Sequence, residues 1–436
     1  MMEIQAIGGY DGVGRNMTVV RSGRAQLAFD CGIKLDSFLL YYGNTQEDYE
    51  KLPVEDLVSI GAIPDLGGVK GDIDAFLVSH GHFDHMGALQ KYVGEYSGQI
   101  FSTPYAAGLI KNRIPRKFHE QVLDVRYKEN IQITPSLSAE FVEVTHSIPQ
   151  ASMVALHTPE GPVVYACDYK FDDHSRIAKT DYTKLKQLGK EGVKALIVEA
   201  LDVGSDGKCL SEEVARAKVH DVMSFVDETK GLIVATTFST HLERIQTLVS
   251  EAKKLGRKVI VLGRSFLPNC TLGEKMKLLD LPPGTLVVAK KLDIVLKKIN
   301  PKNRGKYFIL ATGHQGEPTS VLSRMVDGKL GFQFQRGDAV IFSSRTIPTD
   351  VNIANKSELI DKLKHKGVRV YEDIHVSGHA SKEEHRKLIK MLNPENIIPA
   401  HGSIQMIASY FKLAEEEGYK ANTDVHLLRN GDNIIL

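Results

Sequence analysis

Residues 79–85 read Ser-His-Gly-His-Phe-Asp-His, and this short stretch is the strongest indication of the fold. The apolar segment just before it, DIDAFLV, predicts a buried strand that leads into a loop. Histidine and aspartate together suit Zn²⁺ or a similar ion. Alternate side chains of an extended segment point the same way, so His80 and His82 can share one ion. Asp84 and His85, beyond the bend, can reach a second ion, so the stretch predicts a centre with two metals.

Three more candidate ligands stand where apolar, strand-like segments end. His146 follows AEFVEVT, Asp168 follows GPVVYAC, and His401 follows ENIIPA. Together with the first stretch they complete two sites, and we expect two Zn²⁺ per chain, for which Mn²⁺ or Mg²⁺ can substitute or assist. The expected ligands of the first ion are His80, His82 and His146; those of the second are Asp84, His85 and His401; Asp168 bridges both.

Size and composition place few limits on function. The chain has 436 residues, which fits two or three domains, with 42% hydrophobic and 25% charged residues as in ordinary globular proteins. The formal net charge of +1 gives no sign of a polyanionic partner, so any nucleic-acid surface must be a local patch.

Cysteine usage and hydropathy predict the compartment. The four cysteines are scattered without a C-x-x-C pair and are expected to be reduced thiols. No signal-peptide pattern opens the sequence, and no apolar run has the length of a membrane span. We therefore expect a cytoplasmic protein with no membrane partner.

The secondary-structure pattern predicts an α/β protein with a change of texture near residue 205. Up to there, short β-rich runs alternate with segments of helical spacing, such as 86–96. Beyond it come a long helix starting near Ser211 and a strand–helix–strand unit, typical of a second α/β domain with parallel strands. The expected domains are 1–204, 205–360 and 361–436; that the last belongs with the first is implied only by the family resemblance described below.

The H-x-H-x-D-H element with the downstream His146, Asp168 and His401 resembles the metallo-β-lactamase superfamily. That resemblance implies an αββα sandwich. Asp30, in FDCG, matches the first motif of this superfamily, where an aspartate braces the metal loop without binding metal. A simple turn residue is the other interpretation of Asp30.

Three further motifs resemble those of the β-CASP nucleases. Glu199 ends KALIVEA, His379 lies in HVSGHAS, and His401 lies in PAHG. The resemblance implies an inserted α/β β-CASP domain before the last two motifs, as the change of texture at 205–360 also indicates. Members that process RNA carry histidine at the last motif, as here, whereas those that process DNA carry valine.

Within this group the whole chain resembles ribonuclease J. The segments GHQGEPTSVLSRM (313–325), FSSRTIP (342–348) and HVSGHAS (375–381) are similar to its characteristic segments. Bacterial members continue into a further C-terminal domain, whereas this sequence ends 35 residues after His401, so the archaeal form is the better match. FSSRTIPTDVN departs from the commoner IPGNE version, which leaves the role of that segment open.

The resemblance implies a metal-dependent ribonuclease. Asp84, Glu199 and His379 are the expected catalytic residues, with His379 as proton donor to the leaving oxygen and Glu199 as the residue that orients it. The glycine-rich stretch 9–16, GYDGVGRN, resembles a phosphate loop, but no helix follows, so we interpret it as a β-turn near the metal site. The expected contacts to a 5′-terminal phosphate are Ser239, Arg264, Ser344, His375 and Ser377.

The expected reaction is 5′→3′ exonucleolytic digestion of single-stranded, 5′-monophosphorylated RNA. An RNA endonuclease of the polyadenylation-factor type would share every metal ligand and is the main alternative. A small-molecule hydrolase such as a lactonase would not need Glu199, His379 or an inserted domain, and a non-catalytic scaffold would not need the full ligand set. The sequence leaves the oligomeric state open, and a homodimer is compatible with it.

Overall fold

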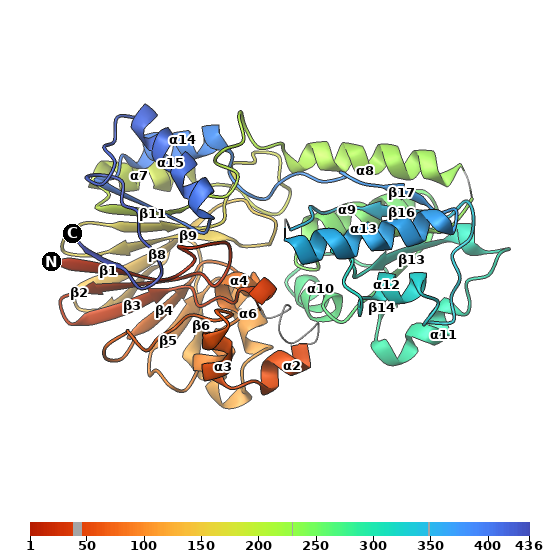
Figure 1. Cartoon of the computed structure of the whole chain (residues 1–436), viewed down its shortest axis with the longest axis horizontal. Coiled ribbons are helices and arrows are strands. Elements are labelled where there is room, and N and C mark those ends of the chain that lie inside the picture. Colours follow the sequence, from red (N-terminus) through yellow and green to blue (C-terminus); the bar gives the residue numbers. More distant parts are fainter. Residues whose placement is uncertain (38–45, 229, 348) are drawn as a thin grey trace. The chain divides into compact units, whose positions relative to one another are not determined.

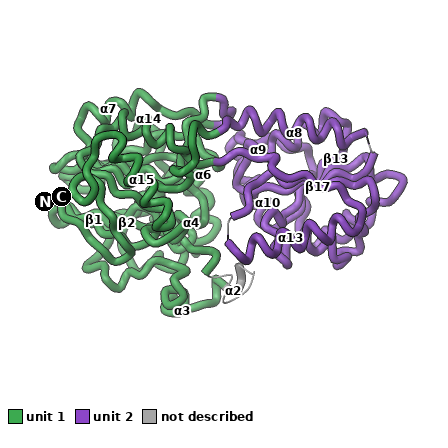
Figure 2. The backbone as a smooth tube through the Cα atoms, turned by 45° about the horizontal axis from the view of Figure 1, so that its top comes forward, with its two compact units in different colours: residues 1–173, 178–209, 378–436 green, residues 174–177, 210–377 purple. Residues whose placement is uncertain are grey.

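The computed structural model describes residues 1–37, 46–228, 230–347 and 349–436. It divides into two compact units (Figure 2): unit 1 is formed by residues 1–173, 178–209 and 378–436, and unit 2 by residues 174–177 and 210–377. Among the described residues, no helix combines the length and the apolar character needed to cross a membrane.

Unit 1 is a sandwich of two mixed sheets (Figure 1). Its central strands are short, apolar and buried along their whole length, because one face of each sheet packs on the other sheet and the outer face is covered by helices. The first sheet has the order β19 (Asn433–Ile435), β1 (Met2–Gly8), β2 (Met17–Ser22), β3 (Ala25–Phe29), β4 (Ala75–Val78), β5 (Gln99–Ser102), β6 (Val122–Asp124). The second has the order β18 (Asn396–Ala400), β11 (Ala195–Glu199), β10 (Val163–Ala166), β9 (Ser152–His157), β8 (Leu137–Glu143), β7 (Asn130–Thr134).

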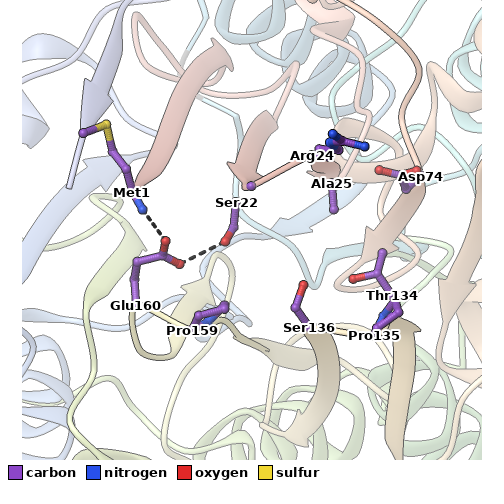
Figure 3. Close-up of a pocket in the computed structure, with 11 residues that line it drawn as sticks. Met1, Ser22, Arg24, Ala25, Asp74, Thr134, Pro135, Ser136, Pro159 and Glu160 are labelled. Atoms are coloured by element: carbon purple, nitrogen blue, oxygen red, sulfur yellow. Dashed lines mark hydrogen bonds and ion pairs between the residues drawn. The ribbon is translucent and has the colours of Figure 1, made fainter.

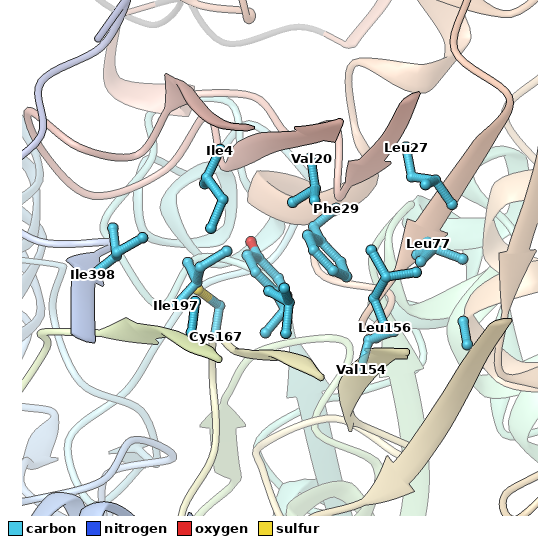
Figure 4. Close-up of a cluster of buried hydrophobic side chains, with 14 of the residues drawn as sticks. Ile4, Val20, Leu27, Phe29, Leu77, Val154, Leu156, Cys167, Ile197 and Ile398 are labelled. Carbon is cyan, nitrogen blue, oxygen red and sulfur yellow. The ribbon is translucent and has the colours of Figure 1, made fainter. Parts of the chain in front are cut away.

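The core of unit 1 lies between these sheets (Figure 4). Phe29 of β3 stacks on Tyr165 of β10 with ring centroids 4.8 Å apart, which joins the two layers. Side chains of the first sheet, Ile4, Val20, Leu27 and Leu77, face Val154, Leu156, Cys167, Ile197 and Ile398 of the second.

Helices cover the outer faces of both sheets, which gives the αββα arrangement expected from the sequence. Within the helix predicted over 86–96, the structure has the last residue of one short helix and a single turn over Leu89–Tyr92, which ends because Val93 is extended and Gly94 has φ 94°. The helices of the first layer are α2 (Gln46–Lys51), α3 (Val54–Ser59), α4 (Phe83–Met86), α5 (Leu89–Tyr92), α6 (Pro104–Lys111) and the 3₁₀ helix η1 (Arg116–Gln121). Those of the second are α7 (Tyr182–Glu191), α14 (Lys382–Leu392) and α15 (Ile404–Glu416).

Unit 2 is built on a six-stranded parallel sheet, as the strand–helix–strand pattern predicted. The strand order is β14 (Leu286–Val287), β13 (Lys258–Leu262), β15 (Tyr307–Ala311), β12 (Ile233–Thr236), β16 (Ala339–Phe342), β17 (Arg369–Tyr371). Its helices are α8 (Glu212–Asp227), α9 (Leu242–Lys254), α10 (Phe266–Lys275), α11 (Leu292–Leu296), α12 (Val321–Val326) and α13 (Asp350–His365), with 3₁₀ helices η2 (Ala289–Lys291) and η3 (Arg304–Lys306).

The boundaries of unit 2 differ from the expected 205–360 mainly at the second end. Residues 361–377 belong with unit 2 because β17 pairs in parallel with β16. The long helix α8 begins where expected, with the Ser211 side chain accepting a hydrogen bond from Glu213 N.

A buried ion pair fixes α8 against α9 inside unit 2. Arg244, which has no exposed surface, donates to both carboxylate oxygens of Glu212 over 2.6 and 2.7 Å. It also donates to the carbonyls of Ser343 and Ile374. Nearby His241 Nε2 lies 3.5 Å from Glu212 Oε2, so a second side chain faces the buried carboxylate.

Candidate metal centre

The candidate ligands of unit 1 lie where strands end. β10, β11 and β18 are parallel neighbours, so their carboxyl ends share one edge of the second sheet. Asp168 follows β10, Glu199 ends β11, and His401 directly follows β18. The loop that begins at His80 follows β4 of the facing sheet, so both layers contribute to one cluster.

The side chains of this cluster form two groups that share Asp168. In each group the candidate ligand atoms all lie within 4.8 Å of one another. Both the residues and their division into two groups are those expected from the sequence. Their function as metal ligands stays a prediction. One group contains His80, His82, His146 and Asp168, and the other contains Asp84, His85, His401 and Asp168.

Ring nitrogens in the first group approach one another as metal ligands do. His82 Nδ1 lies 3.0 Å from His80 Nε2 and 3.1 Å from His146 Nε2. Two nitrogens bound tetrahedrally to one zinc ion, each about 2.0–2.1 Å away, would stand about 3.3 Å apart. The spacing therefore fits a shared ion after a small adjustment.

The outer nitrogens of these rings are held by acceptors, which fixes the inner nitrogens as lone pairs. His146 Nδ1 lies 2.6 Å from the carbonyl oxygen of Gly378, which can only accept, so Nδ1 carries the proton. Ser79 Oγ gives its single proton to the Asp30 carboxylate and so accepts from His80 Nδ1 at 3.0 Å. In both rings Nε2 is left as a lone pair that faces the other ligands.

Asp30 organises the loop that carries the ligands. Its fully buried carboxylate accepts from Ser79 N over 2.8 Å and from His85 Nδ1 over 2.7 Å. The second contact turns the Nε2 lone pair of His85 toward Asp168, 3.3 Å away. These contacts support the bracing function expected for Asp30, which also stays a prediction.

Three residues of the centre have a strained backbone. Asp30, Asp168 and His401 have φ values of 57°, 65° and 48°, in the left-handed region. Residues other than glycine adopt this region at a cost and persist there when the surrounding structure holds them. Here the strained residues come from three separate segments that meet at the cluster.

Electrostatics in the first ligand group favour the forms that bind metal. Burial lowers the pKa of His82 well below its usual value and lowers the pKa of His146 to about 3, so both imidazoles are neutral, as ligands must be. The surrounding histidines hold the pKa of Asp168 well below its usual range despite burial. Asp168 Oδ1 is buried and accepts no hydrogen bond from the described residues, which leaves it available to a cation.

A hydrogen-bonded pair of side chains, His379 and Glu199, lies beside the two ligand groups. His379 Nδ1 lies 2.7 Å from Glu199 Oε2, and Glu199 Oε1 accepts from Tyr169 N over 2.9 Å. Burial opposes protonation of His379, but the charges of Glu199 and Asp168 outweigh it and raise the pKa of His379 to about 9. The ring of His379 stands 5.0 Å from that of His146, centroid to centroid, so a protonated imidazole borders the candidate ligands.

Two residues in contact with the ligands were not singled out from the sequence. Ser79 orients His80, as described above, and Asn16 contacts His401, His85 and the Asp84 carbonyl. The sequence does give an indication for Ser79, because this residue stands beside His80 at the end of a predicted strand. Asn16 had only its position at the end of the glycine-rich stretch 9–16.

The residues expected to contact a 5′-phosphate all lie in unit 2, after the carboxyl ends of its strands. Ser344 is 3% exposed, and its Oγ has no hydrogen-bond partner among the described residues. Their role as a phosphate site stays a prediction. Ser239 follows β12, Arg264 follows β13, Ser344 follows β16, and His375 and Ser377 follow β17.

A separate open pocket of unit 1 lies at the other end of the strands (Figure 3). Its lining includes Ser22, Arg24, Asp74 and Glu160, and Glu160 accepts from Ser22 and from the N-terminal amine. No histidine is among the described residues that line this pocket.

Comparisons with known proteins agree with this architecture. Residues 10–188 match the metallo-β-lactamase superfamily, residues 230–363 the ribonuclease J β-CASP domain, and residues 367–426 the Zn-dependent metallo-hydrolase RNA specificity domain. Ribonuclease J of Pyrococcus abyssi is 41% identical, with 99% of this chain and 96% of the relative covered. The chain belongs to the ribonuclease J family.

Other relatives of the family extend the comparison. Ribonuclease J of Methanocaldococcus jannaschii is 40% identical over 99% of this chain and 98% of its own length. Ribonuclease J 1 of Streptococcus pyogenes is 27% identical, and the match covers 99% of this chain but 74% of that protein. A protein of unknown function from Enterococcus faecalis V583 shares the fold, with a TM-score of 0.68, 16% identity and full coverage of both chains.

Proposed function

We propose that this member of the ribonuclease J family is a two-zinc ribonuclease that digests single-stranded RNA from a 5′-monophosphorylated end. The observation that carries the proposal is the pair of ligand groups sharing the buried Asp168, with His379 and Glu199 beside them. Two relatives that match this chain over nearly their whole length are named ribonuclease J, which supports the choice of RNA as substrate.

The two groups differ in the ligands they offer. The first offers three imidazoles and one carboxylate, a set that suits tetrahedral zinc, and the second offers two imidazoles and two carboxylates, which also suits manganese. When bound, two divalent ions supply the activation of water and the stabilisation of charge on the phosphate. The side chain of Asp84 is 32% exposed, so this ligand is accessible to solvent and to a substrate.

His379 and Glu199 are the proposed proton-transfer pair. Hydrolysis breaks the bond between phosphorus and a ribose oxygen, and that oxygen needs a proton as it leaves. The Glu199 carboxylate keeps His379 protonated and fixes the direction of its ring through the 2.7 Å contact. Glu199 is itself held by Tyr169 N, so the pair has one orientation.

The terminal phosphate would be bound in unit 2. Arg264 supplies charge, and the hydroxyls of Ser239, Ser344 and Ser377 and the imidazole of His375 are further phosphate donors. The unpartnered buried hydroxyl of Ser344 is the feature of this set that most needs a ligand.

Digestion of three RNAs that differ at the 5′ end tests the proposal. RNA with a 5′-monophosphate should release mononucleotides from the first turnover, and RNA with a 5′-hydroxyl or 5′-triphosphate should be digested more slowly. Internal fragments from a 5′-blocked RNA at a comparable rate would instead favour an endonuclease of the polyadenylation-factor type.

A further inference from the structure

The glycine-rich turn at residues 9–16 is in direct contact with the second ligand group. His401 N donates to the Gly9 carbonyl over 2.7 Å, and His401 Nδ1 lies 2.6 Å from Asn16 Oδ1. Asn16 N and Asn16 Nδ2 both donate to the Asp84 carbonyl, over 3.1 and 3.0 Å. Asn16, which is 2% exposed, therefore forms hydrogen bonds to both Asp84 and His401, two candidate ligands that lie far apart in the sequence.

The contacts of Asn16 determine which way its amide points. If oxygen and nitrogen were exchanged, Oδ1 would face the Asp84 carbonyl, and two acceptors would meet at 3.0 Å. Nδ2 therefore faces Asp84, and Oδ1 faces His401.

The orientation of the amide sets the tautomer of His401. Because an amide oxygen only accepts, His401 Nδ1 must carry the proton, and Nε2 is left as a lone pair. That lone pair lies 3.2 Å from Asp168 Oδ1, where an ion shared with Asp168 would be bound. The longer approach of Gly14 N to Nδ1, 3.4 Å, does not compete with this contact.

Glycine at position 9 makes room for the amide. A Cβ at Gly9 would come within 2.4 Å of Asn16 Oδ1, and φ at this residue is 89°. The turn therefore needs Gly9 in order to place Asn16, which is a reason for the glycine other than phosphate binding.

We propose that Asn16 is a positioning residue for the second metal ion, and that it acts by fixing the tautomer of His401 and joining it to the Asp84 segment. The inference rests on the proposed two-metal function. Within the described residues Asn16 also contacts His85, with Nδ2 3.1 Å from His85 Nε2, but forms no hydrogen bond with His80, His82 or His146. Its loss should therefore affect one ion and spare the other.

Cobalt titration of the stripped full-length protein tests the inference, with d–d absorption and elemental analysis as readouts. His401→Ala and His146→Ala provide reference spectra for damage to the second and the first ion. In Asn16→Leu the second ion should bind about 10–100-fold more weakly, as is usual when a partner of a metal ligand is lost. The first should bind as in the wild type.

Two further variants keep the test independent of one substitution. Gly9→Ala retains every polar group but displaces Asn16, and should give the same selective loss. Asn430→Leu is the matched control, because Asn430 Oδ1 anchors Tyr10 N of the same turn without touching a ligand, and it should bind both ions normally.

The possible outcomes separate this inference from the proposed function. Unchanged binding of both ions in Asn16→Leu and Gly9→Ala, or equal weakening of both, would overturn the assignment to Asn16. Failure of the wild-type protein to bind cobalt would instead refute the two-metal function on which the assignment rests.

Discussion

Replacing Asp30 by asparagine removes one acceptor from beneath the metal loop and changes little else. The carboxylate accepts from Ser79 N and Ser79 Oγ through Oδ1 and from His85 Nδ1 through Oδ2, whereas an amide has one oxygen, which can keep both Ser79 donors, and an NH₂ group. If the oxygen stays on Ser79 N, the NH₂ faces His85 Nδ1, donor against donor. Asparagine tolerates the left-handed backbone of residue 30, φ 57°, so the substitution isolates the hydrogen bond from backbone strain.

The size of the effect follows from that single contact. His85 can avoid the clash by moving its proton to Nε2, the nitrogen that faces Asp168 at 3.3 Å and would bind the second ion. A hydrogen bond to a charged group contributes about 1.5–3 kcal/mol. Since about 1.4 kcal/mol is a factor of ten in an equilibrium constant, we expect the affinity for the second ion to fall about 10–100-fold.

Competition for Zn²⁺ against a chromophoric chelator at constant pH measures this affinity. Asp74→Asn is the matched control, because Asp74 Oδ2 accepts from Gln26 N at the other end of the same strands. It should bind both ions as the wild type does. If Asp30→Asn also binds both ions with wild-type affinity, the reasoning from the tautomer of His85 is wrong.

The other predictions concern catalysis, unit 2 and ligand-linked stability. His379→Ala and Glu199→Gln should lower initial rates of RNA cleavage, His379→Ala by about 10²–10⁴-fold, while elemental analysis finds both ions retained; loss of metal would contradict the roles given to the pair. Arg244→Met should destabilise unit 2 by about 3–5 kcal/mol in urea unfolding followed by circular dichroism, because Glu212 is left buried and unpaired. The double variant with Glu212→Leu should recover most of that loss, and an unaltered single variant would refute it. Zn²⁺ at a hundredfold excess over its Kd should stabilise the stripped protein by about 2.7 kcal/mol for each ion bound, and no rise in the thermal midpoint would argue against a folded-state site.

The candidate ligands could be named from the sequence because the chemistry is local in each segment. A buried strand has a recognisable apolar run, and a histidine or aspartate directly after it is placed at the edge of a sheet. His80, Asp168 and His401 all follow this pattern.

Contacts between distant segments could not be predicted in the same way. Asn16 and His401 are 385 positions apart, and nothing near residue 16 indicates a partner there. Glu212 lies in the first turn of α8, where a carboxylate suits the helix N-terminus, but it is also buried and paired with Arg244, which the helix pattern alone does not reveal.

Element boundaries failed for related reasons. The expected boundary at residue 360 missed β17, because the parallel pairing of β17 with β16 has no local signal in the sequence. The apolar spacing over 86–96 predicted one helix, whereas the chain turns at Gly94, where a Cβ would meet the ring of Phe118 at 2.5 Å.

The metal content of the purified chain, measured together with its activity, tests the central claim most directly. We predict about two Zn²⁺ per chain, loss of RNA cleavage when a strong chelator removes them, and recovery when zinc or manganese is restored. If elemental analysis finds no metal and RNA cleavage persists undiminished, the protein is not a two-zinc ribonuclease.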